Sequence, residues 1–167
     1  MIANAHVAQV SLPSDTEVKV TRRFNAPRTL VYRAHAEPAL IRRWMLGPPG
    51  WTMPVCEMDL RVGGAYCWRW RSDDGGQEFG FYGVFTEVIA PERIAHTQQY
   101  DPGSVGADMA PEALVTLDLT EKGGVTTLTV LIDFKTKENR DAAVSTGMTD
   151  GMEMGYKRLD AIFAELA

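Results

Sequence analysis

The sequence predicts an α+β fold in which a curved antiparallel β-sheet wraps around a long C-terminal helix. The first observation is a run of strand-like segments from Thr52 to about residue 135, separated by short turns that contain glycine. The second is an apolar stripe at helical spacing in the last part of the chain. The third is a first strand followed by two short helices. Because the links between strands are short, neighbouring strands should pair antiparallel.

The N-terminal part of the chain divides into an extension and a strand. Residues 1–16 are predicted to form a flexible extension, and residues 17–167 to form a single domain. From Thr16 to Phe24, valine and phenylalanine alternate with polar residues, as in a half-buried strand.

Two prolines mark the short helices that follow. Pro27 suits the first turn of a helix whose apolar side carries Leu30, Val31 and Ala34. Pro38 opens a second helix, ALIRRWM, which ends before Gly47. Together they form a compact V-shaped insertion between the first strand and the rest of the sheet.

The strands of the central region are predicted from alternation and from turn signals such as Gly63-Gly64 and Gly123-Gly124. They lie near residues 52–58, 64–72, 78–89, 92–100, 112–121 and 124–135. Between the predicted strands near 92–100 and 112–121, residues 101–111 form a longer loop of glycine, proline and small residues. Loops of this kind often border a functional site.

The chain closes with one helix predicted over about residues 139–166, with a bend near Gly147. Glycine recurs every fourth residue, at positions 147, 151 and 155, and so forms a bare strip on one helix face. Each interior glycine costs roughly 1 kcal/mol against alanine. Either close backbone packing or a cavity beneath the helix would explain the strip. Met148 and Met152 lie beside it, and methionine adapts to irregular shapes.

Composition excludes several function classes. The net charge is −5 and lysine and arginine are scattered, which argues against a nucleic-acid partner. No apolar run approaches the ~20 residues of a membrane span, and the N-terminus lacks a secretory signal. We therefore expect a cytoplasmic location.

The sequence gives no sign of a metal or cofactor. Two cysteines and three scattered histidines show no ligand spacing, and no phosphate-binding loop or catalytic motif occurs. Cys56 and Cys67 lie in successive predicted strands and could face each other across the hairpin. In the cytoplasm both should be thiols, with a disulfide as the alternative.

Several short motifs, in this order, resemble the helix-grip superfamily, also called START-like or SRPBCC. Within it they resemble the branch of homologues of the activator of heat-shock-protein-90 ATPase. The matching pieces are FNAP at 24–27, VYRA at 31–34, Pro38 to Trp44 with Gly47-Pro48, DLRVGG at 59–64, GVFTE at 83–87, PER at 91–93, and finally Gly147-Met, Gly151-Met and Arg158-Leu159.

The resemblance implies the helix-grip fold with a ligand-sized cavity. It covers residues 17–166. The superfamily includes lipid carriers, hormone receptors, polyketide cyclases and co-chaperones. The eukaryotic namesake of the branch carries a further domain that binds the chaperone, and the 16-residue N-terminal segment is too short to form that domain.

The candidate ligand-binding residues are aromatic or flexible side chains expected to face the helix. Alternation places Tyr66, Trp68 and Trp70 on one face of their strand. In the next strand Phe79, Phe81 and Phe85 share a face if no bulge intervenes, and we take Phe81 and Phe85 as candidates. Any one of them could instead belong to ordinary core. The candidates on the helix itself are Met148, Gly151 and Met152.

Two polar residues could enter an otherwise apolar pocket. His96 and Gln98 should point the same way from their strand. If they point inward, His96 could bind a ligand oxygen or transfer a proton; otherwise it is a structural or surface histidine. Trp44 either closes one end of the cavity or staples the second short helix to the sheet.

We therefore expect a protein that binds a small apolar or aromatic molecule without a cofactor. A cyclase- or hydrolase-like enzyme using His96 ranks second, since the sequence gives no positive evidence of catalysis. An interaction module that regulates a chaperone ranks third. Both a monomer and a homodimer are compatible with the sequence.

Overall fold

The computed structural model describes residues 6–46, 49–103 and 112–166. The strands are β1 (Gln9–Ser11), β2 (Glu17–Phe24), β3 (Trp51–Met58), β4 (Ala65–Ser72), β5 (Glu78–Ile89), β6 (Arg93–Asp101), β7 (Ala113–Lys122) and β8 (Val125–Asp133). The helices are α1 (Arg28–Ala36), α2 (Pro38–Trp44), α3 (Lys137–Ser145) and α4 (Met148–Leu166). Most of the predicted 101–111 loop lies outside the described residues.

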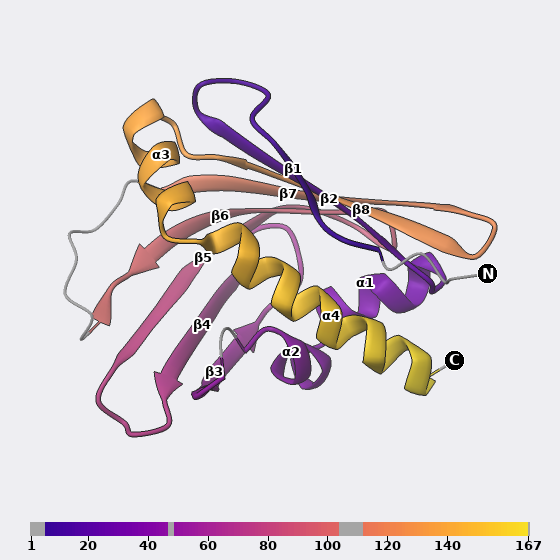
Figure 1. The fold of residues 1–167 in the computed structure, drawn as a ribbon, viewed down its shortest axis with the longest axis horizontal. Coiled ribbons are helices and arrows are strands. Elements are labelled where there is room, and N and C mark those ends of the chain that lie inside the picture. The colour runs from indigo at the N-terminus through magenta and orange to yellow at the C-terminus, as the bar shows by residue number, and fades with distance from the viewer. Residues whose placement is uncertain (1–5, 47–48, 104–111, 167) are drawn as a thin grey trace.

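The described strands form one antiparallel sheet in the order β1-β2-β8-β7-β6-β5-β4-β3. From β3 to β8 each strand pairs with the next along the chain. On the other side of β8 lies β2, and β1 forms the sheet edge beyond it. Figure 1 shows the sheet curling behind α4, with α1 and α2 towards the C-terminal half of α4 and α3 beyond its other end. The predicted α+β arrangement is confirmed.

Part of the N-terminal extension belongs to the sheet. Strand β1, which was not among the predicted strands, pairs with β2, with Val10 opposite Val20. Just before β1, the backbone N–H of Ala8 donates a hydrogen bond of 2.8 Å to Oε1 of Glu153 in α4. The segment therefore contacts both the sheet edge and the final helix.

The predicted single C-terminal helix is in fact two helices, α3 and α4. Thr136 caps α3 by accepting a hydrogen bond from the backbone N–H of Asn139. Gly147 lies between the helices with φ of +79°, a left-handed conformation that ends α3 and that glycine adopts without strain. The expected bend at Gly147 is a complete break.

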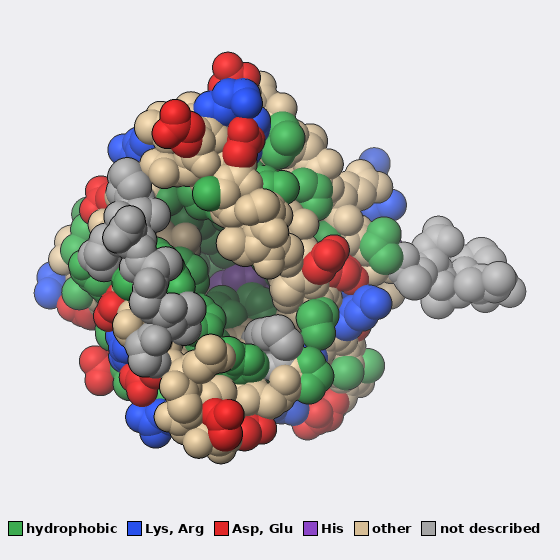
Figure 2. All heavy atoms as spheres, turned by 60° about the vertical axis from the view of Figure 1, so that its left-hand side comes forward, with side chains coloured by type: hydrophobic (Ala, Val, Ile, Leu, Met, Phe, Trp, Pro, Cys, Tyr) green, Lys and Arg blue, Asp and Glu red, His purple; other side chains and the backbone are tan. Residues whose placement is uncertain are grey.

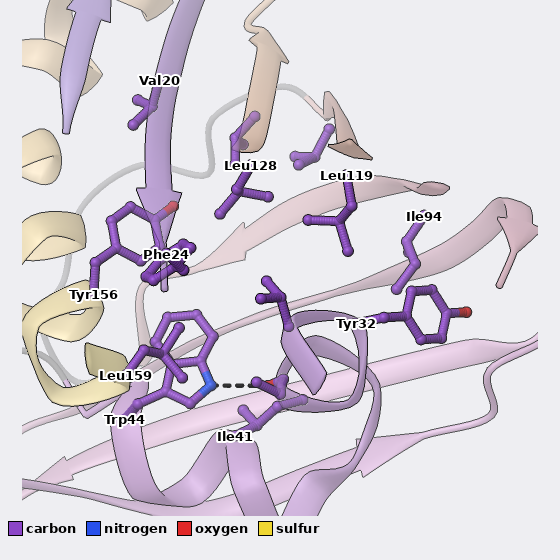
Figure 3. Packing of buried hydrophobic residues seen from close by; sticks show 14 of the residues in the cluster. Val20, Phe24, Tyr32, Ile41, Trp44, Ile94, Leu119, Leu128, Tyr156 and Leu159 are labelled. Atoms are coloured by element: carbon purple, nitrogen blue, oxygen red, sulfur yellow. Dashed lines mark hydrogen bonds between the residues drawn. The ribbon is translucent and has the colours of Figure 1, made fainter. Parts of the chain in front are cut away.

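The core is built where the apolar faces of β2 and α4 meet. Alternation in β2 buries Val18, Val20 and Phe24. The ring of Phe24 meets Tyr156 and Phe163 of α4 edge to face, both at centroid distances of 5.6 Å (Figure 3). Such pairs contribute ~0.5–1.5 kcal/mol beyond the burial of their area. These contacts hold one half of α4 against the sheet.

A buried arginine fixes the same helix electrostatically. The side chain of Arg22 in β2 is fully enclosed, with Nε 3.1 Å from Oε1 of Glu153 and Nη2 2.7 Å from Oδ2 of Asp160. Glu153 and Asp160 are seven residues apart in sequence, two turns along α4, so one guanidinium spans both turns. Arg22 also lies over the ring of Phe24, 4.9 Å from its centroid.

The two cysteines are free thiols on opposite faces of the β3–β4 hairpin. Cys56 pairs with Trp68 and is buried, whereas Cys67 pairs with Glu57. The prediction that Cys56 and Cys67 could face each other across the hairpin is wrong, because a register shift follows Thr52 in β3. Continued without that shift, the pairing of Thr52 with Arg71 would have set Cys56 opposite Cys67, and a one-residue slip turns a side chain to the other face.

Candidate ligand-binding site

A cavity of about 510 Å³ lies between α4 and the inner face of the sheet. Figure 2 shows a hollow whose walls are hydrophobic side chains, with histidine visible at depth. Strands β3 to β8 and helices α1, α2 and α4 all contribute to the lining. The aliphatic part of the wall consists of Met45, Leu46, Met58, Ile94, Val115, Leu117, Val130 and Ile132.

Aromatic side chains of β4 and β5 form one wall. Trp68 opposes Phe81 and Trp70 opposes Phe79, so alternation places the four rings on one face. Trp70 stacks on Phe79 with centroids 5.3 Å apart and an interplanar angle of 21°. Phe85, further along β5, also lines the cavity. The predicted inward direction of these residues agrees with their positions.

Tyr66 occupies a different place from the other aromatic candidates. It is buried but is not among the residues that line the cavity. Its hydroxyl donates a 2.6 Å hydrogen bond to the carbonyl of Thr97, and its ring lies 4.5 Å from that of Trp68, centroid to centroid. Tyr66 therefore supports the wall from behind.

His96 and Gln98 bring polar atoms into the cavity from β6. His96 is only 4% exposed, and its Nδ1 lies 3.0 Å from the carbonyl oxygen of Thr97. Burial lowers the pKa of His96 to about 4, so its ring is neutral at pH 7. Gln98 is half-buried and also lines the cavity.

A second histidine, His35 of α1, also lines the cavity and was not predicted. Its Nδ1 lies 2.8 Å from the carbonyl oxygen of Val31, and burial lowers its pKa to about 4. Because His35 follows Val31 by four residues, the two share one helix face. The buried Val31 was therefore a signal that could have placed His35 inward.

Trp44 lines the cavity and joins the two short helices. Its Nε1 donates a 2.8 Å hydrogen bond to the carbonyl of Ala34, which joins α2 to α1 (Figure 3). Its ring lines the cavity and stacks on Tyr156, with centroids 6.0 Å apart. It thus fixes the second short helix to the first rather than to the sheet. Trp51, Phe79 and Tyr156 complete the aromatic lining; none was a candidate, although Phe79 was expected to share the face of Phe81.

The glycines of α4 differ in what they face. A Cβ at Gly155 would lie 3.1 Å from Cε3 of Trp44, so Gly155 serves close packing. A Cβ at Gly151 would have no atom within 4 Å, and Gly151 lines the cavity together with Met148 and Met152. Gly155 lines the cavity as well, so the two glycines differ in the space beside the backbone and not in whether they border the cavity.

The chemistry of the site is apolar binding with a few hydrogen-bonding atoms. Within the described ranges, no Asp, Glu, Lys or Arg lines the cavity. The same part of the chain contains no group of three or more histidine, cysteine or acidic side chains able to hold a metal ion. None of its helices is long and apolar enough to cross a membrane.

An antiparallel sheet curled around a C-terminal helix, with a cavity beneath that helix, defines a helix-grip protein. The family described as Activator of Hsp90 ATPase homolog 1-like protein matches residues 25–164, and the chain belongs to it. The resemblance found in the sequence is thereby confirmed.

Solved structures from bacteria share the fold. A Rhodobacter sphaeroides protein is 29% identical, with 96% of this chain and 99% of that chain covered and a TM-score of 0.84. A Mycobacterium smegmatis protein is 23% identical, with coverages of 93% and 96% and a TM-score of 0.81. An AHSA1-like protein from Aeromonas hydrophila is 23% identical, with coverages of 86% and 93% and a TM-score of 0.66. No curated protein matches the chain.

Proposed function

We propose that this protein binds a small apolar or aromatic molecule in the cavity between the sheet and α4. The observation that carries the proposal is the lining: aromatic and aliphatic side chains with His35, His96 and Gln98 as its few polar members. The volume of about 510 Å³ falls within the ~300–1,000 Å³ typical of small-molecule sites. The ligand-binding residues we propose are those named from the sequence, with Tyr66 in a supporting position and His35, Trp51 and Phe79 added.

The two alternatives rank lower for physical reasons. An enzyme of the cyclase or hydrolase type needs convergent polar groups, yet no carboxylate among the described residues lines the cavity beside His96. A chaperone-regulating module needs an exposed apolar patch, whereas the apolar side chains described above line a cavity between the sheet and α4. Neither alternative has a specific observation in its favour.

Binding of Nile red, an uncharged apolar dye, tests the proposal. The wild type should bind the dye, and Gly151→Leu should raise its Kd more than about tenfold, equivalent to ~1.4 kcal/mol, because the leucine side chain occupies the cavity. Gly151→Ala is the matched control, since a single methyl group leaves most of the volume free. Fluorescence titration gives the Kd, and thermal unfolding of the same samples reports the fold.

Two results would contradict the cavity role. The first is a wild type that binds no dye. The second is a Gly151→Leu variant destabilised by the ~1–3 kcal/mol typical of overpacking whose folded fraction binds the dye normally. If neither result is obtained, native mass spectrometry of protein purified from its own host would identify any molecule that the cavity retains.

A further inference from the structure

The hydrogen bonds around His96 fix which of its ring nitrogens carries the proton. The hydroxyl of Tyr66 donates to the carbonyl oxygen of Thr97 over 2.6 Å. Nδ1 of His96 lies 3.0 Å from the same carbonyl oxygen and 3.1 Å from the tyrosine oxygen. A carbonyl oxygen only accepts, and the tyrosine proton is already given to it, so Nδ1 must be the donor. Since the ring is neutral, Nε2 has a free lone pair.

That lone pair is accessible from the cavity. Among the described residues, none is a hydrogen-bond partner of Nε2 of His96. In that part of the chain, the only side-chain nitrogen or oxygen both enclosed and unpartnered is Nε1 of Trp68. Nε2 is therefore not sealed within protein. Because His96 is 4% exposed and lines the cavity, the space that Nε2 reaches is the cavity.

His35 of α1 has the same hydrogen-bond arrangement as His96 and also lines the cavity. Its Nδ1 donates to the carbonyl of Val31, and its Nε2 likewise has no partner among the described residues. Its ring meets that of Trp44, with centroids 5.0 Å apart. The two histidines thus present hydrogen-bond acceptors to an otherwise apolar space.

We propose that the cavity selects an uncharged ligand that donates a hydrogen bond, from a hydroxyl or N–H group, to Nε2 of His96; this rests on the proposed ligand-binding function. An ether oxygen at that position would meet a second lone pair and gain nothing. A carboxylate would leave water without a counter-charge, because no charged side chain among the described residues lines the cavity. His96 is thus a specificity-determining residue, and His35 a second acceptor beside Trp44.

Two ligands that differ only in the donor test the inference. The probes are 2-naphthol, which has a hydroxyl donor, and 2-methoxynaphthalene, which has none. The wild type at pH 7 should bind 2-naphthol about tenfold more tightly, as expected for one buried hydrogen bond. In His96→Phe, which keeps a planar ring, the preference should fall to about one or reverse. Displacement of Nile red, which has no donor itself, gives both affinities.

A matched variant locates the effect. His6→Phe makes the same substitution at the histidine that does not line the cavity, and it should keep the 2-naphthol preference because Nε2 of His96 is intact. Unchanged Nile red affinity in His96→Phe shows that the cavity persists in that variant. Histidine ¹⁵N NMR of the wild type adds a readout without mutation: His96 should have its proton on Nδ1, and 2-naphthol should shift the Nε2 resonance.

The outcomes distinguish a failure of the His96 hydrogen-bond proposal from a failure of the proposed ligand-binding function. If Nile red binds but 2-naphthol has no advantage, or the advantage survives in His96→Phe, the inference is wrong and the ligand-binding function stands. A His96 proton on Nε2 in the free protein would also overturn the inference. If none of the three molecules binds the wild type, both proposals fail together.

Discussion

Two buried histidines of this protein have no charged hydrogen-bond partner among the described residues. His35 and His96 each give Nδ1–H to a backbone carbonyl, and burial lowers the pKa of each to about 4. The unfolded chain would hold both near the ordinary value of ~6.5. Native protein therefore keeps the rings neutral over a range in which the unfolded chain protonates them. At the scale of single residues, this difference links stability to pH.

The sign of that link follows from the depressed pKa. Each histidine contributes stability that is fully present above pH ~6.5 and is lost as the pH falls towards 4. From pH 7 to pH 5 the free energy of unfolding should drop by roughly 2 kcal/mol per histidine. His96→Phe and His35→Phe should each lose only about half as much over this range. Urea unfolding at pH 5, 6, 7 and 8 measures the slopes, and variants as steep as the wild type would disprove the assignment.

At the scale of elements, α4 combines two different neighbours along one helix face. Near Gly155 it touches the ring and the carbonyl of Trp44, and near Gly151 it covers the cavity. Spacing in the sequence could show that glycines 151 and 155 share a face, but not what lies under each. That depends on where α2 ends, because Trp44 is its last residue. Periodicity therefore predicted the strip but not the different surroundings of its two glycines.

A pair of alanine substitutions distinguishes these neighbours. Gly151→Ala should raise the free energy of unfolding by up to ~1 kcal/mol, because alanine favours the helix and its Cβ meets open space. Gly155→Ala should gain nothing or lose stability, because its Cβ would lie 3.1 Å from Cε3 and 3.3 Å from the carbonyl oxygen of Trp44. Urea unfolding of both variants measures the difference. Equal gains would show that Trp44 moves aside freely.

In the strands, the local sequence pattern predicts which face a residue occupies but not its depth or its partner on the next strand. Alternation correctly assigned faces to Trp68, Trp70 and Phe81, since a strand has a fixed period of two. It could not place Tyr66 behind the wall, because the period gives a face and not a depth. The register of Cys56 depended on a shift after Thr52, in a stretch that contains Pro54; proline within a strand is typical of an edge or a bulge, but it does not fix the register. Partners across strands are thus harder to predict than the strands.

At the scale of the whole molecule, the order of elements was predictable and the volume between them was not. Short links between the strands determine an antiparallel meander, and the stripe of α4 determines which side of the helix faces it. The cavity depends on the fit of side chains from nine elements, which no single segment of the sequence encodes. A ligand there would contact most of the sheet and stabilise the fold as a unit.

Cys56 offers a probe of that coupling. It is 5% exposed, and burial raises the pKa of its thiol to about 11, so the native thiol should resist labelling until the fold opens. Nile red at ten times its Kd should slow the labelling of Cys56 about tenfold, because binding lowers the open population by that factor. Cys67, half-buried on the opposite face of the hairpin, should react in the native state and change little. Maleimide labelling followed by peptide mass spectrometry measures both rates in one sample, and Cys67→Ser isolates the slower one. A Cys56 rate unaffected by bound dye would mean that the thiol is reached through a local opening of β3 that leaves the cavity intact.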